Sequence, residues 1–574
     1  MTAAPAPFDI AACLADGPSQ AERALLAHAA AGTLCQLGTA CPDPADPAAP
    51  RIRAGLLAHL LCGGSDLAPV APQGIRLIGA VIEGPLVLSF CDTRGETDLR
   101  LCAFTETIAA RRTRFAQLVL SGSRMPGLNA EGAEIAGSAF LLGITATGRL
   151  SFANAGIGGQ LALHGAQIAG LTAQGARIGA SVYLRATAGT AFVSTGEVSL
   201  SGAEIGGQLA CDGARLANPG GIALTLQAAH VDGDVILRTQ GDLPFQTQGE
   251  LRLSGARIGG QLDFGGARLA NPAGPALSAQ RMQVEAEFFW QTVSVEAGTL
   301  HLPSARVGDL VDDLASWPGD GRTYLDGFTY DRITRDAPTD ADSRLKWLAC
   351  AATKDGRFLP QPYGQCASVL HRMGHEAEAR AIMEEQARLK GIARRKAARL
   401  RGGGGDLLAG FDWLWDSAAR AVVGYGYAPF RALLWIAGLA VLAAGLAAAA
   451  WTEGSMAPNN DLIVSSESWQ QIMAQDCIPH PAPGCIANPA AAWNGPEGAG
   501  LDWESFNPVA WGVDAVVPVV DIGQTAAWSP SKDRGFWGFT LWWARWPLIY
   551  LGWLVTALAA AAATGIIQRT PPGS

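Results

Sequence analysis

Large apolar residues recur every five or six positions through the middle of the chain, as in the steps from Phe152 to Ile157 and from Ile157 to Leu163. This spacing is neither the 3.6-residue period of a helix nor the 2-residue period of an ordinary strand. The residue two places before each is also apolar, and in an extended segment these two share a face. The pattern predicts very short strands with two inward side chains each, separated by corners of Gly and polar residues. The predicted core residues are Phe152, Ile157, Leu163, Ile168, Ile178, Leu184, Leu200, Ile205, Leu216, Leu253, Ile258, Phe264 and Leu269.

A longer repeat lies over this short one. The segment Ile157-Gly-Gly-Gln-Leu161 returns at 205–209 and again at 258–262, at offsets of 48 and 53 residues. Repeats at such spacing are typical of a stacked array of similar units. Four faces of five or six residues make a turn of 20 to 22 residues, so the sequence predicts a four-sided β-solenoid.

These residues resemble the pentapeptide-repeat superfamily, and the resemblance implies a right-handed quadrilateral β-helix. The segments 358–380, 424–431 and 506–524 extend it, because together they are similar to a bacterial family that joins such a solenoid to a two-span membrane tail. The resemblance covers about residues 75 to 569. Members of that family are often labelled membrane-associated oxidoreductase.

The composition changes along the chain in a way that predicts several segments. Residues 91–130 follow the five-six rhythm poorly, and regular spacing fades after Val307. The predicted segments are an N-terminal helical cap (1–74), the solenoid (75–335), a helical hairpin with a basic helix (336–401), an interfacial amphipathic segment (402–431), a first transmembrane helix (432–451), an extracytoplasmic loop (452–545), a second transmembrane helix (546–567) and a tail (568–574).

Two uncharged stretches, 432–451 and 546–567, carry the membrane prediction. At 1.5 Å per residue each is long enough for the roughly 30 Å hydrocarbon core of a bilayer. Fourteen of the 17 Trp lie at or beyond Trp413, which suits an aromatic belt at the membrane interface. The predicted interfacial residues are Trp413, Trp415, Trp435, Trp451, Trp542, Trp543 and Trp546.

Charge predicts the orientation of these spans. Residues 388–431 contain nine Lys and Arg, whereas 452–536 contain ten acidic residues and two basic ones. The positive-inside rule therefore predicts a multi-pass protein of a bacterial cytoplasmic membrane, with the solenoid and both termini in the cytoplasm. The loop holds Cys477 and Cys485 on the oxidising side, where we expect a disulfide, and the other nine cysteines are expected to stay reduced.

Motifs of catalysis are lacking in the sequence. It contains no nucleophile elbow, P-loop or HExxH, so no catalytic residue, cofactor or metal ligand is predicted. His371 and His375 are four apart but flank a Gly, the basic cluster at 111–114 suits a solvated face, and Gly156-Ile-Gly-Gly suits a solenoid corner better than a dinucleotide loop.

These features leave three functions to weigh. A membrane-tethered scaffold, in contact with lipid and with a protein partner on one solenoid face, is the leading one. The net charge of −9 argues against nucleic acid as a partner, and an oligomer is left open. A two-span channel or transport protein is the alternative, since 509–522 is apolar and could be re-entrant. We favour a surface helix there, because aspartates are costly inside a membrane. The oxidoreductase label is less favoured still.

Overall fold

The computed structural model describes residues 9–319, 321–351, 358–400, 405–426, 430–478 and 481–564. The chain divides into two compact units, Met1–Ile382 and Met383–Ser574. Each unit has its own core, and they are described in turn.

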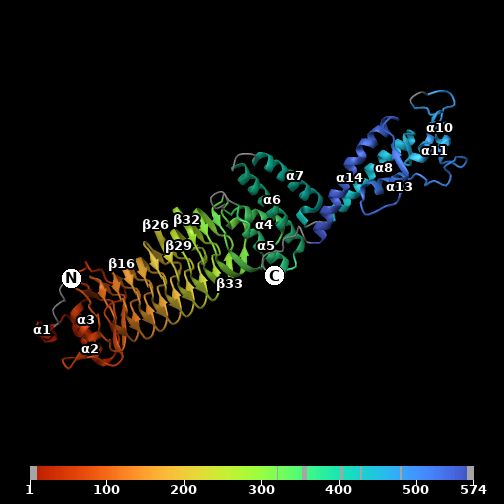
Figure 1. Cartoon of the computed structure of the whole chain (residues 1–574). Coiled ribbons are helices and arrows are strands. Elements are labelled where there is room, and N and C mark those ends of the chain that lie inside the picture. The colour runs from red at the N-terminus through yellow and green to blue at the C-terminus, as the bar shows by residue number, and fades with distance from the viewer. Residues whose placement is uncertain are drawn as a thin grey trace. The chain divides into compact units, whose positions relative to one another are not determined.

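The first unit is a parallel β-solenoid of about 11 turns, shown as the orange-to-green stack of arrows in Figure 1. Its strands form two long sheets. The 20-stranded sheet contains β1 (Cys35–Gln36), β5 (Gly74–Ile78), β7 (Glu96–Arg100), β10 (Arg114–Phe115), β11 (Leu118–Val119), β14 (Glu134–Ile135), β15 (Ala139–Phe140), β17 (Gly156–Ile157), β18 (Leu161–Ala162), β20 (Arg177–Ile178), β21 (Val182–Tyr183), β24 (Glu204–Ile205), β25 (Leu209–Ala210), β27 (His230–Val231), β28 (Val235–Ile236), β30 (Arg257–Ile258), β31 (Leu262–Asp263), β33 (Gln283–Trp290), β35 (Arg306–Asp312) and β37 (Thr329–Ile333).

The second sheet has 15 strands, and a small antiparallel pair lies outside both sheets. The 15 strands are β2 (Arg51–Arg53), β6 (Val81–Glu83), β8 (Ala103–Phe104), β9 (Ile108–Ala109), β12 (Arg124–Met125), β13 (Leu128–Asn129), β16 (Thr145–Ser151), β19 (Gln167–Thr172), β22 (Val193–Ser194), β23 (Val198–Ser199), β26 (Arg215–Thr225), β29 (Gln246–Arg252), β32 (Arg268–Ser278), β34 (Ser294–His301) and β36 (Thr323–Tyr324). The separate pair is β3 (Gly64–Ser65) with β4 (Ala68–Pro69).

Equivalent residues of successive turns stack in register. Ile157 pairs with Ile178, Ile178 with Ile205, Ile205 with Val231, and Val231 with Ile258. The 48- and 53-residue repeats of the sequence therefore span two turns each. Backbone hydrogen bonds join one turn to the next, and all thirteen predicted core residues are buried between the sheets.

Helices cover the N-terminal end of the stack: α1 (Ile10–Ala15), α2 (Gln20–Ala31) and α3 (Ala54–Leu61). The connecting strands belong to the solenoid, because Cys35 pairs with Leu77 and Ile52 with Ile82. The first turn thus begins within the segment predicted to be only a cap. The buried Glu22 carboxylate accepts hydrogen bonds from Arg53, with Nε at 2.8 Å, and this ion pair holds α2 on β2.

The last turn is covered by α4 (Ala341–Ala349) and α5 (Gln361–Arg372) (Figure 1). An exposed edge of a sheet leaves unpaired backbone groups. Two glutamines of α5 meet such groups: Gln361 accepts from Gly327 N at 2.9 Å, and Gln365 donates to the carbonyl oxygen of Tyr330 at 2.7 Å. The guanidinium of Arg344 donates to both oxygens of Asp312, at 2.8 and 3.0 Å, and both side chains are buried.

Within the described residues, the second unit is built on four long helices, one of them shared with the first unit, and a folded segment between the last two. The long helix α6 (Glu376–Leu400) starts in the first unit and continues into the second. The further elements are α7 (Gly405–Val423), η2 (Gly424–Gly426), α8 (Arg431–Thr452), β38 (Met456–Pro458), α9 (Asp461–Val464), α10 (Glu467–Met473), α11 (Pro489–Trp493), α12 (Pro508–Val516), α13 (Gln524–Ala527), β39 (Trp528–Pro530) and α14 (Phe536–Ala563); the first unit also has the short helix η1 (Leu314–Ser316).

Two of these helices, α8 and α14, are long and apolar enough to cross a membrane. Only 22% and 28% of their most apolar windows are buried, whereas the core helix of a soluble protein is mostly buried. Side chains such as Leu434, Val441 and Trp553 face outward from the protein. Exposed apolar surface of this kind is stable in lipid and costly in water.

The helix α14 begins ten residues before the predicted start at residue 546. The charge on Arg545 suggested that boundary, yet the helix continues through it. The Arg545 guanidinium lies over the rings of Trp542 and Trp546, at 5.2 and 5.0 Å from their centroids. The helix ends at Ala563, and residues 565–567 of the predicted span lie outside the described residues.

The segment from 453 to 535, which lies within the predicted loop 452–545, contains a small aromatic core. Trp469, Trp493, Trp511 and Trp528 are buried there together with alanines of α8. The Glu453 carboxylate accepts hydrogen bonds from the first amides of α14, including Trp537 N at 2.8 Å, so an anion caps the positive end of that helix.

Two disulfides occur within the described residues. Cys477 and Cys485 are joined with their Cα atoms 5.0 Å apart. Cys62 and Cys91 are also joined, with Cα atoms 6.0 Å apart, so the expectation that these two stay reduced is wrong. They are separated by 29 residues, and the turn of the solenoid that brings them together could not be located from the sequence.

Candidate functional site: a groove along the solenoid

Glycines form the corners that follow one column of stacked strands. A Cβ atom on Gly206 would lie 2.6 Å from the carbonyl oxygen of Gly179 in the neighbouring turn. Gly158 and Gly179 meet carbonyl oxygens of their neighbours in the same way. Only glycine allows this close approach, so the repeated Ile-Gly-Gly segment serves the stacking of turns.

The residue just before each inward isoleucine or valine forms a second column. Arg177, Glu204, His230 and Arg257 pair with one another in successive turns, and all four side chains are exposed. At the roughly 4.8 Å spacing of hydrogen-bonded strands, Arg177 and Arg257 lie about 14 Å apart. Along the column Glu204 lies next to Arg177 of the preceding turn, and neighbouring side chains of opposite charge stabilise a pair of strands.

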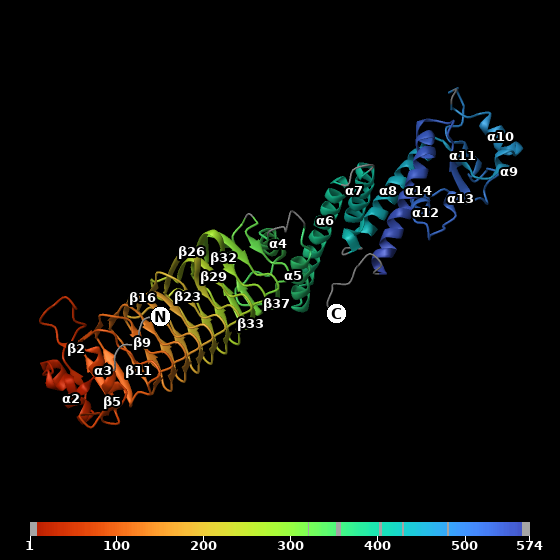
Figure 2. The same cartoon turned by 60° about the vertical axis from the view of Figure 1, so that its left-hand side comes forward.

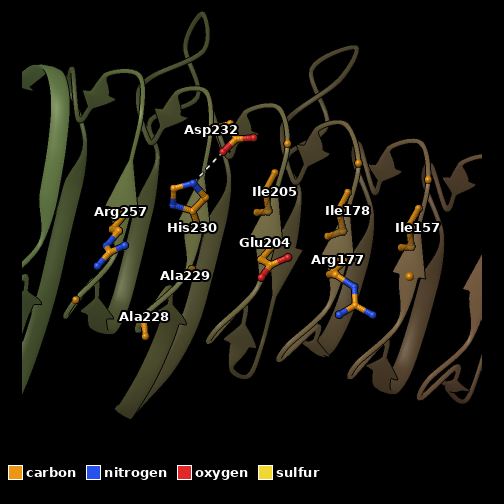
Figure 3. Close-up of a pocket in the computed structure, with 15 residues that line it drawn as sticks. Ile157, Arg177, Ile178, Glu204, Ile205, Ala228, Ala229, His230, Asp232 and Arg257 are labelled. Atoms are coloured by element: carbon orange, nitrogen blue, oxygen red, sulfur yellow. Dashed lines mark ion pairs between the residues drawn. The ribbon is translucent and has the colours of Figure 1, made fainter.

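These two columns border a groove with a volume of about 860 Å³ (Figure 3). Its floor is the backbone of the short strands and glycine corners. The labelled charged residues rise from successive strands, and His230 Nε2 lies 2.9 Å from a carboxylate oxygen of Asp232. The groove therefore presents positive and negative side chains from positions set by the stacked backbone.

One position of the charged column carries no side chain. Gly156 pairs with Arg177 on one side and with Glu134 on the other. A Cβ atom there would meet nothing within 4 Å, and the backbone does not have a positive φ. Gly156 therefore leaves one end of the groove open without being required by the fold.

The chemistry of the groove is that of recognition by charge and hydrogen bonding. Arg177 and Arg257 can donate to carboxylates, and Glu204 can accept from basic or amide groups. Within the described residues, no group of three or more His, Cys, Asp and Glu side chains could hold a metal ion.

Other residues singled out by the sequence have ordinary structural partners. His371 Nδ1 lies 3.0 Å from a carboxylate oxygen of Glu376, just after the turn at Gly374. Two arginines of the basic cluster pair with acidic residues of a neighbouring turn, Arg111 with Glu131 and Arg114 with Glu134.

The predicted interfacial tryptophans divide into two groups. Trp413 and Trp415 on α7, Trp435 on α8, and Trp543 and Trp546 on α14 have exposed rings. Trp542 is half-buried, and Trp451 stacks on Phe506 at 4.4 Å between centroids. Trp451 thus belongs to the aromatic core at the end of α8.

Comparisons with models of protein families, with curated proteins and with solved structures find no match to this chain. The resemblance to pentapeptide-repeat proteins therefore stays a hypothesis, and the groove is the feature from which a function can be argued.

The charged column was missed in the sequence, although a signal for it exists. Each member directly precedes an inward residue, as in Arg177-Ile178, Glu204-Ile205 and Arg257-Ile258. Aligning the inward positions turn by turn would have placed these side chains in one line.

The glycine corners give the first prediction. Gly158→Ala should destabilise the solenoid by about 1–3 kcal/mol, the usual cost of overpacking, because its Cβ would meet the carbonyl oxygen of Ala136. The control Gly156→Ala, two residues away in open space, should change stability by no more than about 0.5 kcal/mol. Urea unfolding followed by circular dichroism measures both. Equal effects of the two variants would show that the corners do not require glycine.

Proposed function

We propose that this protein is a membrane-tethered scaffold whose solenoid binds a protein partner along the groove. The groove is the observation that carries the proposal, because its charged side chains are held in register by the backbone of successive turns. In this proposal the solenoid is the right-handed quadrilateral type that the sequence resemblance implies. The helices α8 and α14 hold it at a bacterial cytoplasmic membrane, where lipid is the second partner.

The spacing of the column indicates what kind of partner would fit. Charges recur about every 4.8 Å along the solenoid, and side chains on one face of an α-helix recur about every 5.4 Å. Over the three steps from Arg177 to Arg257 the two repeats differ by only about 1.8 Å, so one helix face could meet Arg177, Glu204 and Arg257. We infer a partner helix with acidic groups opposite the arginines and a basic group opposite Glu204.

We test this partner surface with a photoreactive amino acid in place of Arg177. In native membranes it should crosslink to a partner protein, and the same group at Gln167 should not, because Gln167 lies on β19 of the other sheet. Adding Glu204→Arg should abolish the crosslink from position 177, since it reverses the central charge of the groove. Equal capture from positions 177 and 167, or capture that survives Glu204→Arg, would contradict a specific partner in the groove.

The orientation in the membrane is part of the proposal, and two observations favour opposite orientations. The basic residues before α8 and the acidic segment after it favour a cytoplasmic solenoid. The Cys62–Cys91 disulfide argues the other way, because such bonds are uncommon in the reducing cytosol. We favour the charge argument, because positively charged residues near the spans directly bias insertion.

A reporter fused after Ser574 tests the orientation. A reporter that works only in the cytoplasm should be active there. Activity of a periplasmic reporter at the same place would reverse the proposed orientation and would put the Cys62–Cys91 bond in an oxidising compartment.

A channel or transport role is a second candidate, and the packing of α12 against α8 and α14 favours it. A short helix between two spans is an arrangement from which some pores are built. Planar-bilayer recording of the purified protein is its test: conductance is expected if the role is real, and a silent bilayer under all conditions removes it. The oxidoreductase label remains the least favoured alternative.

A further inference from the structure

The short helix α12 packs against both α8 and α14, and the three labels lie together in Figure 2. Glycines make the close approach possible. A Cβ atom on Gly512 would lie 2.5 Å from the carbonyl oxygen of Ala440, and one on Gly552 would overlap the carbonyl oxygen of Val516. The same Cβ atom on Gly512 would lie 2.9 Å from the Cβ atom of Ala444 on α8. Small residues at helix contacts are the typical means by which helices associate in membranes.

The contacts also fix the depth of α12 along the two long helices. Ala440 lies near the middle of the uncharged stretch 432–451. Gly552, which meets the end of α12, is six residues beyond Trp546 on α14, about 9 Å further along the helix axis. It lies sixteen residues from the start of α14 at Phe536, about 24 Å along the axis. Both measures place the end of α12 well inside the span.

The turn after α12 is tied back to it by one carboxylate. Asp514 accepts hydrogen bonds at 2.8 Å from Ile522 N, Thr525 N and the Thr525 hydroxyl. Non-helical backbone is tolerated at membrane depth only when its polar groups have partners in the protein or in water. The Asp514 carboxylate is the partner of these two backbone amides, and this role explains why an aspartate occurs in a largely apolar segment.

Apolar side chains form the tip of this turn and point away from the protein. Val519 is 84% exposed, and Val520 and Ile522 are also exposed. They add to the exposed apolar surface of α8, which includes Val441 and Leu442 at the same part of that helix. This common surface is what lipid tails would cover.

We propose that α12 and the turn 517–523 form a re-entrant segment, with Val519 and Val520 in the hydrocarbon of the bilayer. The inference rests on the membrane location of α8 and α14 in the proposed function, and it differs from the outer-surface helix that the aspartates of this segment suggested. Lipid covers the apolar tip, because the exposed side chains of the tip continue the lipid-facing surface of α8.

Asp521 would carry a charge into the bilayer if the turn 517–523 is re-entrant. Its carboxylate accepts a hydrogen bond from Gly523 N at 3.1 Å, and the side chain is exposed. A charge at this depth is costly, and such residues in membrane proteins are usually functional. Asp521→Asn removes the charge and should keep the tip in the bilayer.

Labelling of cysteines introduced one at a time, with a charged, membrane-impermeant maleimide, tests whether the turn 517–523 lies in the bilayer. The full chain is reconstituted in phospholipid nanodiscs, and labelling is read for each peptide by mass spectrometry, so the native cysteines can stay. Val519→Cys should react at least tenfold more slowly than Leu462→Cys, which replaces a similarly exposed leucine of α9. Leu442→Cys, in the middle of α8, should also be slow. Asp521→Asn should not speed the reaction at position 519.

The outcomes separate the inference from the proposal on which it rests. Fast labelling at 519 with slow labelling at 442 would overturn the re-entrant segment and leave α8 in the membrane. Fast labelling at both positions would overturn the membrane location itself.

Discussion

The ladder of backbone hydrogen bonds between successive turns is the interaction on which the first unit depends. Parallel strands of two residues are too short to be stable alone, so each turn is held by the turns on either side. This has two consequences. The first and last turns need partners for their free edges, which come from α2, held on β2 by the Glu22–Arg53 pair, at one end and from Gln361 and Gln365 at the other. The close stacking also requires glycine at the corners, and the missing side chains leave the groove.

The interior of the solenoid could be predicted from sequence, and its outer surface could not. Buried positions such as Ile178 and Phe264 repeat every five or six residues because each short strand must fill the same core. The stretch 91–130 obeys this rule less clearly, since buried positions there include Thr97 and Asp98, the latter paired with Arg100. The charged column was not recognised from the sequence, because the turns that separate Arg177, Glu204 and His230 are longer than the predicted turn of 20 to 22 residues.

In the second unit, composition predicted the two apolar helices, and contacts decided their ends. A charge at Arg545 looked like a boundary, but stacking on Trp542 and Trp546 lets the helix include it. The role of Trp451 depends on Phe506, more than 50 residues away, and the packing of Gly512 on α8 likewise joins distant segments. A sequence read by local pattern does not show such contacts, so the aromatic core and the position of α12 became visible only in the structure.

The central claim of the proposed function is that one chain joins a stacked solenoid to a unit whose helices α8 and α14 lie in lipid. Hydrogen–deuterium exchange of the full chain, in nanodiscs and after removal of lipid, tests this most directly. The account predicts slow exchange through the solenoid strands in both conditions, and slow exchange of α8, α12 and α14 only in nanodiscs. Slow exchange of these three helices without lipid or detergent, or fast exchange of the solenoid strands in nanodiscs, would contradict it.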